Sequence, residues 1–180
     1  MPIRTPSQTI GPFFHVGLQW KDGQRVLFSG PGESIVLTGC VYDGAGAPMA
    51  DALVETWQAD PAGTVPGTGD AARPYGYSRA ATASDGRFSI ETVMPGACAG
   101  PGGEKHAPQI SVTIFARGLL KAVRTRVFVA SSDAVRDDPL IRAAGPRSAT
   151  LMAIRDGKDP GIWHWDVRLQ GKDETVFIAT

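Results

Sequence analysis

Residues 106–115 read His-Ala-Pro-Gln-Ile-Ser-Val-Thr-Ile-Phe, and from Gln109 onward polar and apolar side chains alternate. This alternation is typical of a β-strand, in which successive side chains point to opposite faces. Gln109 and Ser111 therefore lie side by side on one face, at a spacing where two histidines could chelate one metal ion. An amide and a hydroxyl are poor ligands for iron or zinc, so the strand offers a place for a metal but not the side chains that would bind it.

The rest of the chain continues this pattern of short runs separated by turns rich in glycine and proline. Strands are predicted over 34–42, 52–59, 77–83, 87–93, 109–115, 121–129, 149–155, 162–169 and 175–178. The turns at 84–86, 116–120 and 156–159 predict three hairpins. A helical turn or two is expected within 131–144, capped by Ser131, Ser132 or Asp133 and limited by Pro139.

Strands that recur about every ten residues with almost no helix predict an all-β fold, an antiparallel β-sandwich. We expect one domain over residues 1–180, in which 1–33 form an extended N-terminal arm and loop and 34–180 form the sandwich. The arm carries an apolar cluster that includes Phe13, Phe14 and Val16. This cluster is expected either to fold onto its own sandwich or to pack against another chain.

Composition excludes several classes of protein. The 180 residues carry 18 basic and 18 acidic side chains, so the net charge is zero and a nucleic-acid-binding surface is not expected. Since no apolar run approaches the length of a membrane span and the N-terminus lacks a signal-peptide core, we expect a cytoplasmic protein without membrane contact. Two cysteines do not make a disulfide framework, and Cys40 is expected in the core.

The histidines and the serines suggest no other chemistry. The spacing of His15, His106 and His164 fits no metal-ligand motif, and no carboxylate partner is evident. His106 is expected to be a solvated loop residue, with a place in a pocket wall as the alternative. His164 is expected on an exposed or interface face. No Gly-x-Ser-x-Gly sequence suggests a serine hydrolase.

Several separated motifs agree in order and spacing with one known family. These are Val-Glu-Thr-Trp-Gln-Ala-Asp at 54–60, Ser-Asp-Gly-Arg-Phe at 84–88, Pro-Gly at 95–96 and the strand pair within 109–128. In these motifs the chain resembles the intradiol ring-cleaving dioxygenases, a β-sandwich family with non-haem ferric iron. Residues 5–18, 115–118 and 171–177 narrow the likeness to the alpha chains of its two-chain, protocatechuate-cleaving members.

The resemblance implies where iron ligands would stand. Catalytic chains of the family hold iron with two tyrosines and a His-x-His pair. Val65 and Cys98 stand at the tyrosine positions here, and Gln109 and Ser111 stand at the histidine positions. The resemblance therefore implies a chain with no catalytic residue and no bound cofactor, whose Fe(III) is carried by a partner beta chain.

The resemblance also implies a role for the arm and for one arginine. In related enzymes the alpha arm lines the pocket built around the partner's iron, which would make Thr9, Pro12 and Phe13 part of the pocket wall. The family often has tyrosine where Phe13 stands. Arg117 would face the same pocket, where a guanidinium suits the ring carboxylate of protocatechuate.

Together these residues predict a non-catalytic alpha subunit in a hetero-oligomer of alpha–beta pairs. The assembled enzyme would serve aromatic compound catabolism in the beta-ketoadipate pathway, cleaving protocatechuate with O₂ to 3-carboxy-cis,cis-muconate. This chain would supply pocket wall and subunit interface. Two alternatives stay open: an intradiol enzyme that acts alone with an unusual site, and a β-sandwich binding module without an oxygenase partner.

Overall fold

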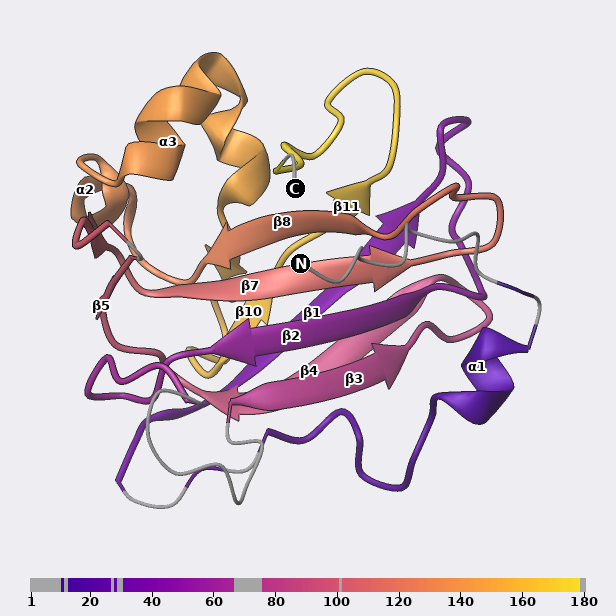
Figure 1. The fold of residues 1–180 in the computed structure, drawn as a ribbon, viewed down its shortest axis with the longest axis horizontal. Coiled ribbons are helices and arrows are strands. Elements are labelled where there is room, and N and C mark those ends of the chain that lie inside the picture. Colours follow the sequence, from indigo (N-terminus) through magenta and orange to yellow (C-terminus); the bar gives the residue numbers. More distant parts are fainter. Residues whose placement is uncertain are drawn as a thin grey trace, which may run out of the picture.

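The chain forms two β-sheets packed face to face, with short helices at the edges (Figure 1). This computed structural model describes residues 11, 13–26, 28, 31–66, 76–100 and 102–178. The predicted sandwich is therefore confirmed. Within the described residues, no helix is long and apolar enough to cross a membrane.

The first sheet is built around β1 (Ser34–Tyr42), which pairs antiparallel with β4 (Arg87–Val93). On its other side β1 pairs parallel with β10 (Ile162–His164) and β11 (Val167–Arg168). The short β9 (Ile154–Arg155) continues the sheet beside β10. The predicted antiparallel sandwich therefore includes two parallel pairings at one edge of β1, because the chain returns to that edge from the same direction after a long excursion.

The second sheet is antiparallel throughout, in the order β3-β2-β7-β8. It comprises β2 (Leu53–Gln58), β3 (Tyr77–Ala81), β7 (Gln109–Phe115) and β8 (Val123–Phe128). The hairpin predicted between β7 and β8 is confirmed. A small ladder of β5 (Cys98–Ala99) and β6 (Lys105–His106) precedes β7 and lies at the end of the sheet where β7 begins (Figure 1).

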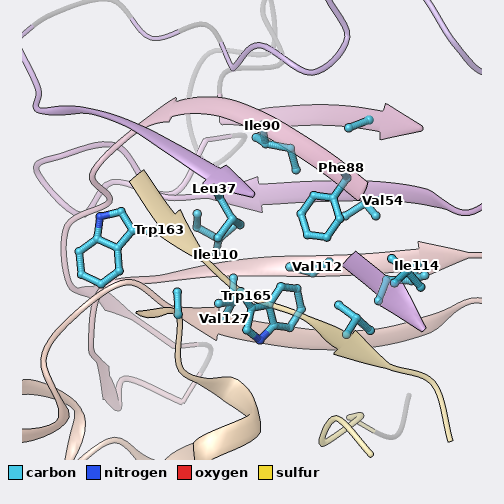
Figure 2. Close-up of a cluster of buried hydrophobic side chains, with 14 of the residues drawn as sticks. Leu37, Val54, Phe88, Ile90, Ile110, Val112, Ile114, Val127, Trp163 and Trp165 are labelled. Atoms are coloured by element: carbon cyan, nitrogen blue, oxygen red, sulfur yellow. The ribbon is translucent and has the colours of Figure 1, made fainter. Parts of the chain in front are cut away.

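The core fills the space between the two sheets. Figure 2 shows side chains from both sheets meeting there, with Leu37 and Ile90 from the first sheet and Val54, Ile110 and Val112 from the second. All five are at most 2% exposed. β7 contributes Ile110, Val112 and Ile114 to this core, because every second residue of the strand points inward. Cys40 is also buried, as expected.

Among the described residues, four short helical segments accompany the sheets: α1 (Phe14–Gly17), α2 (Ser132–Val135), α3 (Pro139–Ala144) and the 3-10 helix η1 (Gly145–Leu151). The predicted cap is confirmed, because the Ser131 hydroxyl accepts from the Ala134 N–H. Pro139 does not end a helix but begins one, at the first helical position where a missing N–H costs nothing.

The helices after β8 cover one end of the second sheet. Phe128 at the end of β8 packs with Val135 and Leu151 in a second apolar cluster, and all three are buried. Thr150 anchors η1 from the other side, because its carbonyl accepts from the Trp165 indole N–H at 2.9 Å. The strand predicted over 149–155 is consequently reduced to β9.

The hairpin predicted around residues 84–86 is wrong. The turn itself closes, with the Ala83 N–H donating to the Arg87 carbonyl at 2.8 Å. Beyond it the strands separate: β3 pairs with β2 and β4 pairs with β1. The two strands belong to opposite sheets because each finds a longer partner there, which also buries the inward side chains of both.

Two further strand predictions fail at the C-terminal side. The run 162–169 is broken because the Asp166 carboxylate, not a backbone carbonyl, accepts from the Cys40 N–H at 2.9 Å. Residues 175–178 form no ladder. The Thr175 N–H donates to the first sheet at Arg168 and the Ile178 N–H donates to the second at Arg124, so this segment links the sheets.

Candidate functional site

A cavity of about 570 Å³ opens at the end of the second sheet where β2 ends and β7 begins. It lies between that end of the sheet, the loop that follows β2 and the β5–β6 ladder. Its walls are formed by Trp57, Gln58, Ala59, Gly63, Thr64, Val65, Cys98, Ala99, Gly100, His106, Gln109, Ser111 and Arg126. This volume is within the range of about 300–1,000 Å³ that is usual for small-molecule sites.

The four positions expected to replace iron ligands all line this cavity. Val65, Cys98, Gln109 and Ser111 come from three separate parts of the chain, and the fold brings them together. Gln109 and Ser111 share the outward face of β7, as their spacing predicts. Gln109 is only 7% exposed, whereas Ser111 is open to solvent.

These side chains do not fit ferric iron. Val65 carries no lone pair, and the amide of Gln109 and the hydroxyl of Ser111 are neutral oxygen donors that bind such a cation weakly. The Cys98 thiol would be the one strong ligand among them. In the part of the chain that the structure describes, no three His, Cys, Asp or Glu residues are grouped so that they could hold a metal ion.

Arg126 brings a positive charge to the cavity wall. It lies opposite Ser111 in the β7–β8 register, and its Nη1 donates to Gln109 Oε1 at 3.4 Å. Among the described residues, no carboxylate forms an ion pair with it. The family likeness did not point to Arg126, because the side chain becomes part of the site only through the pairing of β8 with β7.

His106 was predicted to be a solvated loop residue, and this is wrong. Its ring is buried at 6% exposure and forms part of the cavity wall. Nδ1 lies 3.1 Å from Asp138 Oδ2, and Nε2 lies 3.3 Å from Glu104 Oε1. The expectation of no carboxylate partner is likewise wrong, since Asp138 follows 32 residues later and only the fold brings it near.

Asp138 connects the cavity to the start of α3. One carboxylate oxygen accepts from the Leu140 N–H at 2.8 Å, and the other accepts from the Ala107 N–H at 3.0 Å as well as facing His106. Glu104 lies on the solvent side of the ring. Its pKa lies below the ordinary value because its own backbone N–H, and then the His106 ring, stabilise the carboxylate.

Phe13 and Arg117 do not line the cavity. Arg117 follows the far end of β7, and the strand's seven residues span about 20 Å between the two ends. Figure 1 shows α1 and the β7–β8 turn at one end of the sandwich and β5 at the other. Phe13 is 79% exposed. Thr9 and Pro12 lie outside the described residues.

The Arg117 side chain is 71% exposed and already has an anionic partner. Its Nε lies 2.7 Å from Asp51 Oδ2, in the loop that precedes β2. This pair leaves most of the guanidinium free to contact another anion, because only one edge of its fork is used.

The later part of the arm contacts the sandwich of its own chain. Arg79 on β3 holds this part, donating from Nη1 to the Leu18 carbonyl at 2.7 Å and lying 4.9 Å from the centre of the Trp20 ring. Trp20 also stacks on Tyr77. In contrast, Phe13 and Val16 are 79% and 68% exposed, so the earlier part presents apolar surface.

Tyr77, which contacts Trp20 and Arg79, is less acidic than a free tyrosine. Burial is the main cause, and Glu55 nearby adds to it, so the pKa of Tyr77 is raised to about 12.

His164 lies elsewhere, on β10. It is half-exposed as predicted and lies 3.0 Å from Asp156. Backbone N–H groups of residues 159 and 158, and then His164, lower the pKa of Asp156 to about 2.

Comparison with known proteins identifies the family. A family model described as "Dioxygenase" matches residues 11–171. A protocatechuate 3,4-dioxygenase alpha chain from Burkholderia cepacia is 38% identical, covering 97% of this chain and 96% of its own length. This chain belongs to the intradiol dioxygenase family. A second relative, the protocatechuate 3,4-dioxygenase alpha chain of Pseudomonas putida, is 34% identical over 99% of both chains.

Other intradiol dioxygenases are more distant. A protocatechuate 3,4-dioxygenase beta chain from Burkholderia cepacia is 28% identical over 80% of this chain and 67% of its own length. Among solved structures, hydroxyquinol 1,2-dioxygenase from Pseudomonas putida DLL-E4 aligns with a TM-score of 0.62 at 21% identity, covering 91% of this chain and 65% of that one. The intradiol ring-cleavage dioxygenase of Tetranychus urticae gives 0.61 at 15% identity over 97% and 95%. These structures share the fold.

Proposed function

We propose that this chain is the non-catalytic alpha subunit of a protocatechuate 3,4-dioxygenase. In this proposal a partner beta chain carries the Fe(III), and the assembled enzyme uses O₂ to open the ring of protocatechuate, giving 3-carboxy-cis,cis-muconate. Support comes from two relatives named as alpha chains, which match over nearly the whole length. The whole of residues 1–180 would act as one domain in the cytoplasm.

One observation carries the proposal. The cavity that holds the ligand positions is lined by Val65, Cys98, Gln109 and Ser111, a set that does not fit ferric iron. A chain that keeps the fold of a metal enzyme but not its ligands is suited to support a site on another chain. A relative named as a protocatechuate 3,4-dioxygenase beta chain supports a beta chain as that partner.

The end of the sandwich opposite the cavity is the part we assign to the shared pocket. The arm residues Thr9, Pro12 and Phe13 would form wall, and Arg117 would attract or orient the ring carboxylate of protocatechuate. Two facts support this: Phe13 is exposed and apolar, and the Arg117 fork is largely free. Exposed apolar surface of this kind is stabilised when a partner covers it.

Co-expression tests the proposal. The full-length chain would be produced alone and together with a beta chain that carries two ligand tyrosines and a His-x-His pair. Each preparation would be analysed for iron, subunit ratio and protocatechuate-dependent oxygen uptake. We expect equal amounts of both subunits, about one iron per pair and oxygen uptake from the complex, in an oligomer of alpha–beta pairs.

The chain produced alone provides the control. We expect it to contain no stoichiometric iron and to consume no oxygen. If the lone chain held close to one iron, with a tyrosinate-to-iron absorption band and turnover, it would be an intradiol enzyme acting by itself. If it failed to associate with any such beta chain, the binding-module alternative would replace the proposal.

A further inference from the structure

We propose that the cavity bounded by Trp57, Gln109, Ser111 and Arg126 is a metal-free binding site for a planar aromatic carboxylate. The inference does not rest on the proposed function, because it concerns what this chain binds by itself. It starts from a cationic side chain that the fold places in a preformed hollow, beside the positions at which catalytic chains of the family carry their iron ligands.

The charge of Arg126 is available to a ligand. In the described part of the chain its only polar side-chain contact is with the neutral amide of Gln109. The nearby acids, Glu104 and Asp138, both face the His106 ring. A guanidinium has five N–H donors, and a carboxylate can accept two of them side by side.

Neighbouring polar groups would fix the ligand's orientation. The Gln109 carbonyl oxygen accepts from Arg126 Nη1, which limits the positions that the guanidinium can take. The Gln109 amide N–H₂ is a further donor that the amide can present once its oxygen is used in this way. Ser111 pairs with Arg126 in register and adds a solvent-exposed hydroxyl on the same sheet face.

Other parts of the cavity wall are apolar and aromatic. Trp57 pairs with Ser111 across β2 and β7, and its side chain is 37% exposed where it lines the cavity. Ala59 and Val65 add further apolar wall. Trp57 and Arg126 stand on either side of Ser111 in the strand register. This arrangement favours a flat ring that carries a carboxylate, because the ring can contact the indole while the anion meets the guanidinium.

Calorimetric titration of the full-length chain, in whatever form it purifies, tests this with benzoate as the probe. Benzamide is its neutral isostere. We expect one benzoate per chain, and binding of benzamide at least tenfold weaker. Arg126→Gln should weaken benzoate binding at least tenfold, whereas Arg124→Gln should leave it within twofold. Arg124 is the matched control because it lies two residues away on the same strand and is exposed outside the cavity.

A second variant guards against a folding defect. Ser111→Phe keeps every charge but fills the hollow, and its exposed strand position accepts an aromatic residue. It should also abolish benzoate binding. The proposal is overturned if the chain binds no benzoate, if benzamide binds as tightly, if both arginine variants lose affinity equally, or if benzoate binding survives Arg126→Gln. The last result would place the anion away from Arg126.

Discussion

Replacing Arg117 by alanine separates a role in the shared pocket from a role in folding. The side chain is 71% exposed, and its partner Asp51 is 21% exposed. An exposed ion pair contributes about 0–1 kcal/mol to stability. We therefore expect Arg117→Ala to lower the free energy of unfolding of the chain by less than about 1 kcal/mol.

The expected effect on substrate is larger. A hydrogen bond to a charged group contributes about 1.5–3 kcal/mol. Engaging the substrate weakens the contact with Asp51, which offsets about 0.5–1 kcal/mol of that gain. The remaining gain of about 1–2 kcal/mol corresponds to a roughly 5- to 30-fold rise in KM for protocatechuate in the Arg117→Ala complex.

Asp51 supplies a test in the opposite direction. Asp51→Asn removes the competing carboxylate at 2.7 Å and keeps the shape of the side chain. If Arg117 contacts the substrate carboxylate, KM should fall by about 2- to 5-fold, which is the offset of about 0.5–1 kcal/mol expressed as a ratio. A rise in KM would mean that Asp51 positions the arginine and does not compete for it.

Steady-state oxygen uptake by the assembled enzyme measures both effects. Arg136→Ala is a suitable control, because Arg136 is 73% exposed, is ion-paired with Asp133 and directly follows α2, at the other end of the molecule from the β7–β8 turn (Figure 1). It should leave KM unchanged. A KM for the Arg117→Ala complex within twofold of the parent would refute the assigned role, whatever happens to kcat.

Three predictions concern stability and are read by denaturation of the full-length chain. Phe128→Ala should cost about 3–5 kcal/mol, because Phe128 is fully buried beneath the helices that follow β8. Gly39→Ala should cost about 1–3 kcal/mol or more, because the new Cβ would lie 1.7 Å from the Trp165 carbonyl oxygen. The pKa of Asp156 is lowered from 3.8 to about 2, so Asp156 stabilises the fold above pH 4 and this contribution is lost as pH falls toward 2.

Each of these predictions has its control and its contrary result. Leu120→Ala, at an 81% exposed position, should change the free energy of unfolding little. If Phe128→Ala lowered the free energy of unfolding no more than Leu120→Ala does, the buried cluster would be contradicted. Gly157→Ala meets no atom within 4 Å and should be tolerated. A Gly39→Ala chain of parental stability would contradict the close approach. For Asp156→Asn, the stability difference from the parent should shrink between pH 4 and 2, and a constant difference would contradict the lowered pKa.

Much of the fold could be predicted from local sequence. The strands β1, β4 and β7 have the predicted bounds, because alternation and flanking turns are local signals that the tertiary structure did not override. The same signals failed at residues 84–86. A closed turn does not decide whether the strands on either side pair with each other or pass to opposite sheets, since that choice depends on which longer partners they find.

The candidate site divides in the same way. The likeness to known motifs indicated Val65, Cys98, Gln109 and Ser111, and the fold places all four on one cavity. It gave no sign of Arg126, which reaches the same cavity because β8 pairs with β7.

The sequence alone determined the sandwich and the unsuitability of the ligand positions for iron, because side-chain period and donor chemistry are properties of residues and their immediate neighbours. The tertiary structure decided the partners: Asp138 against His106, Asp51 against Arg117, and Arg126 against Gln109 in the cavity wall. Those contacts join residues far apart in the chain. They depend on strand order and register. The chain adopts the order and register that leave the least apolar surface exposed over the whole molecule, and this cannot be evaluated one segment at a time.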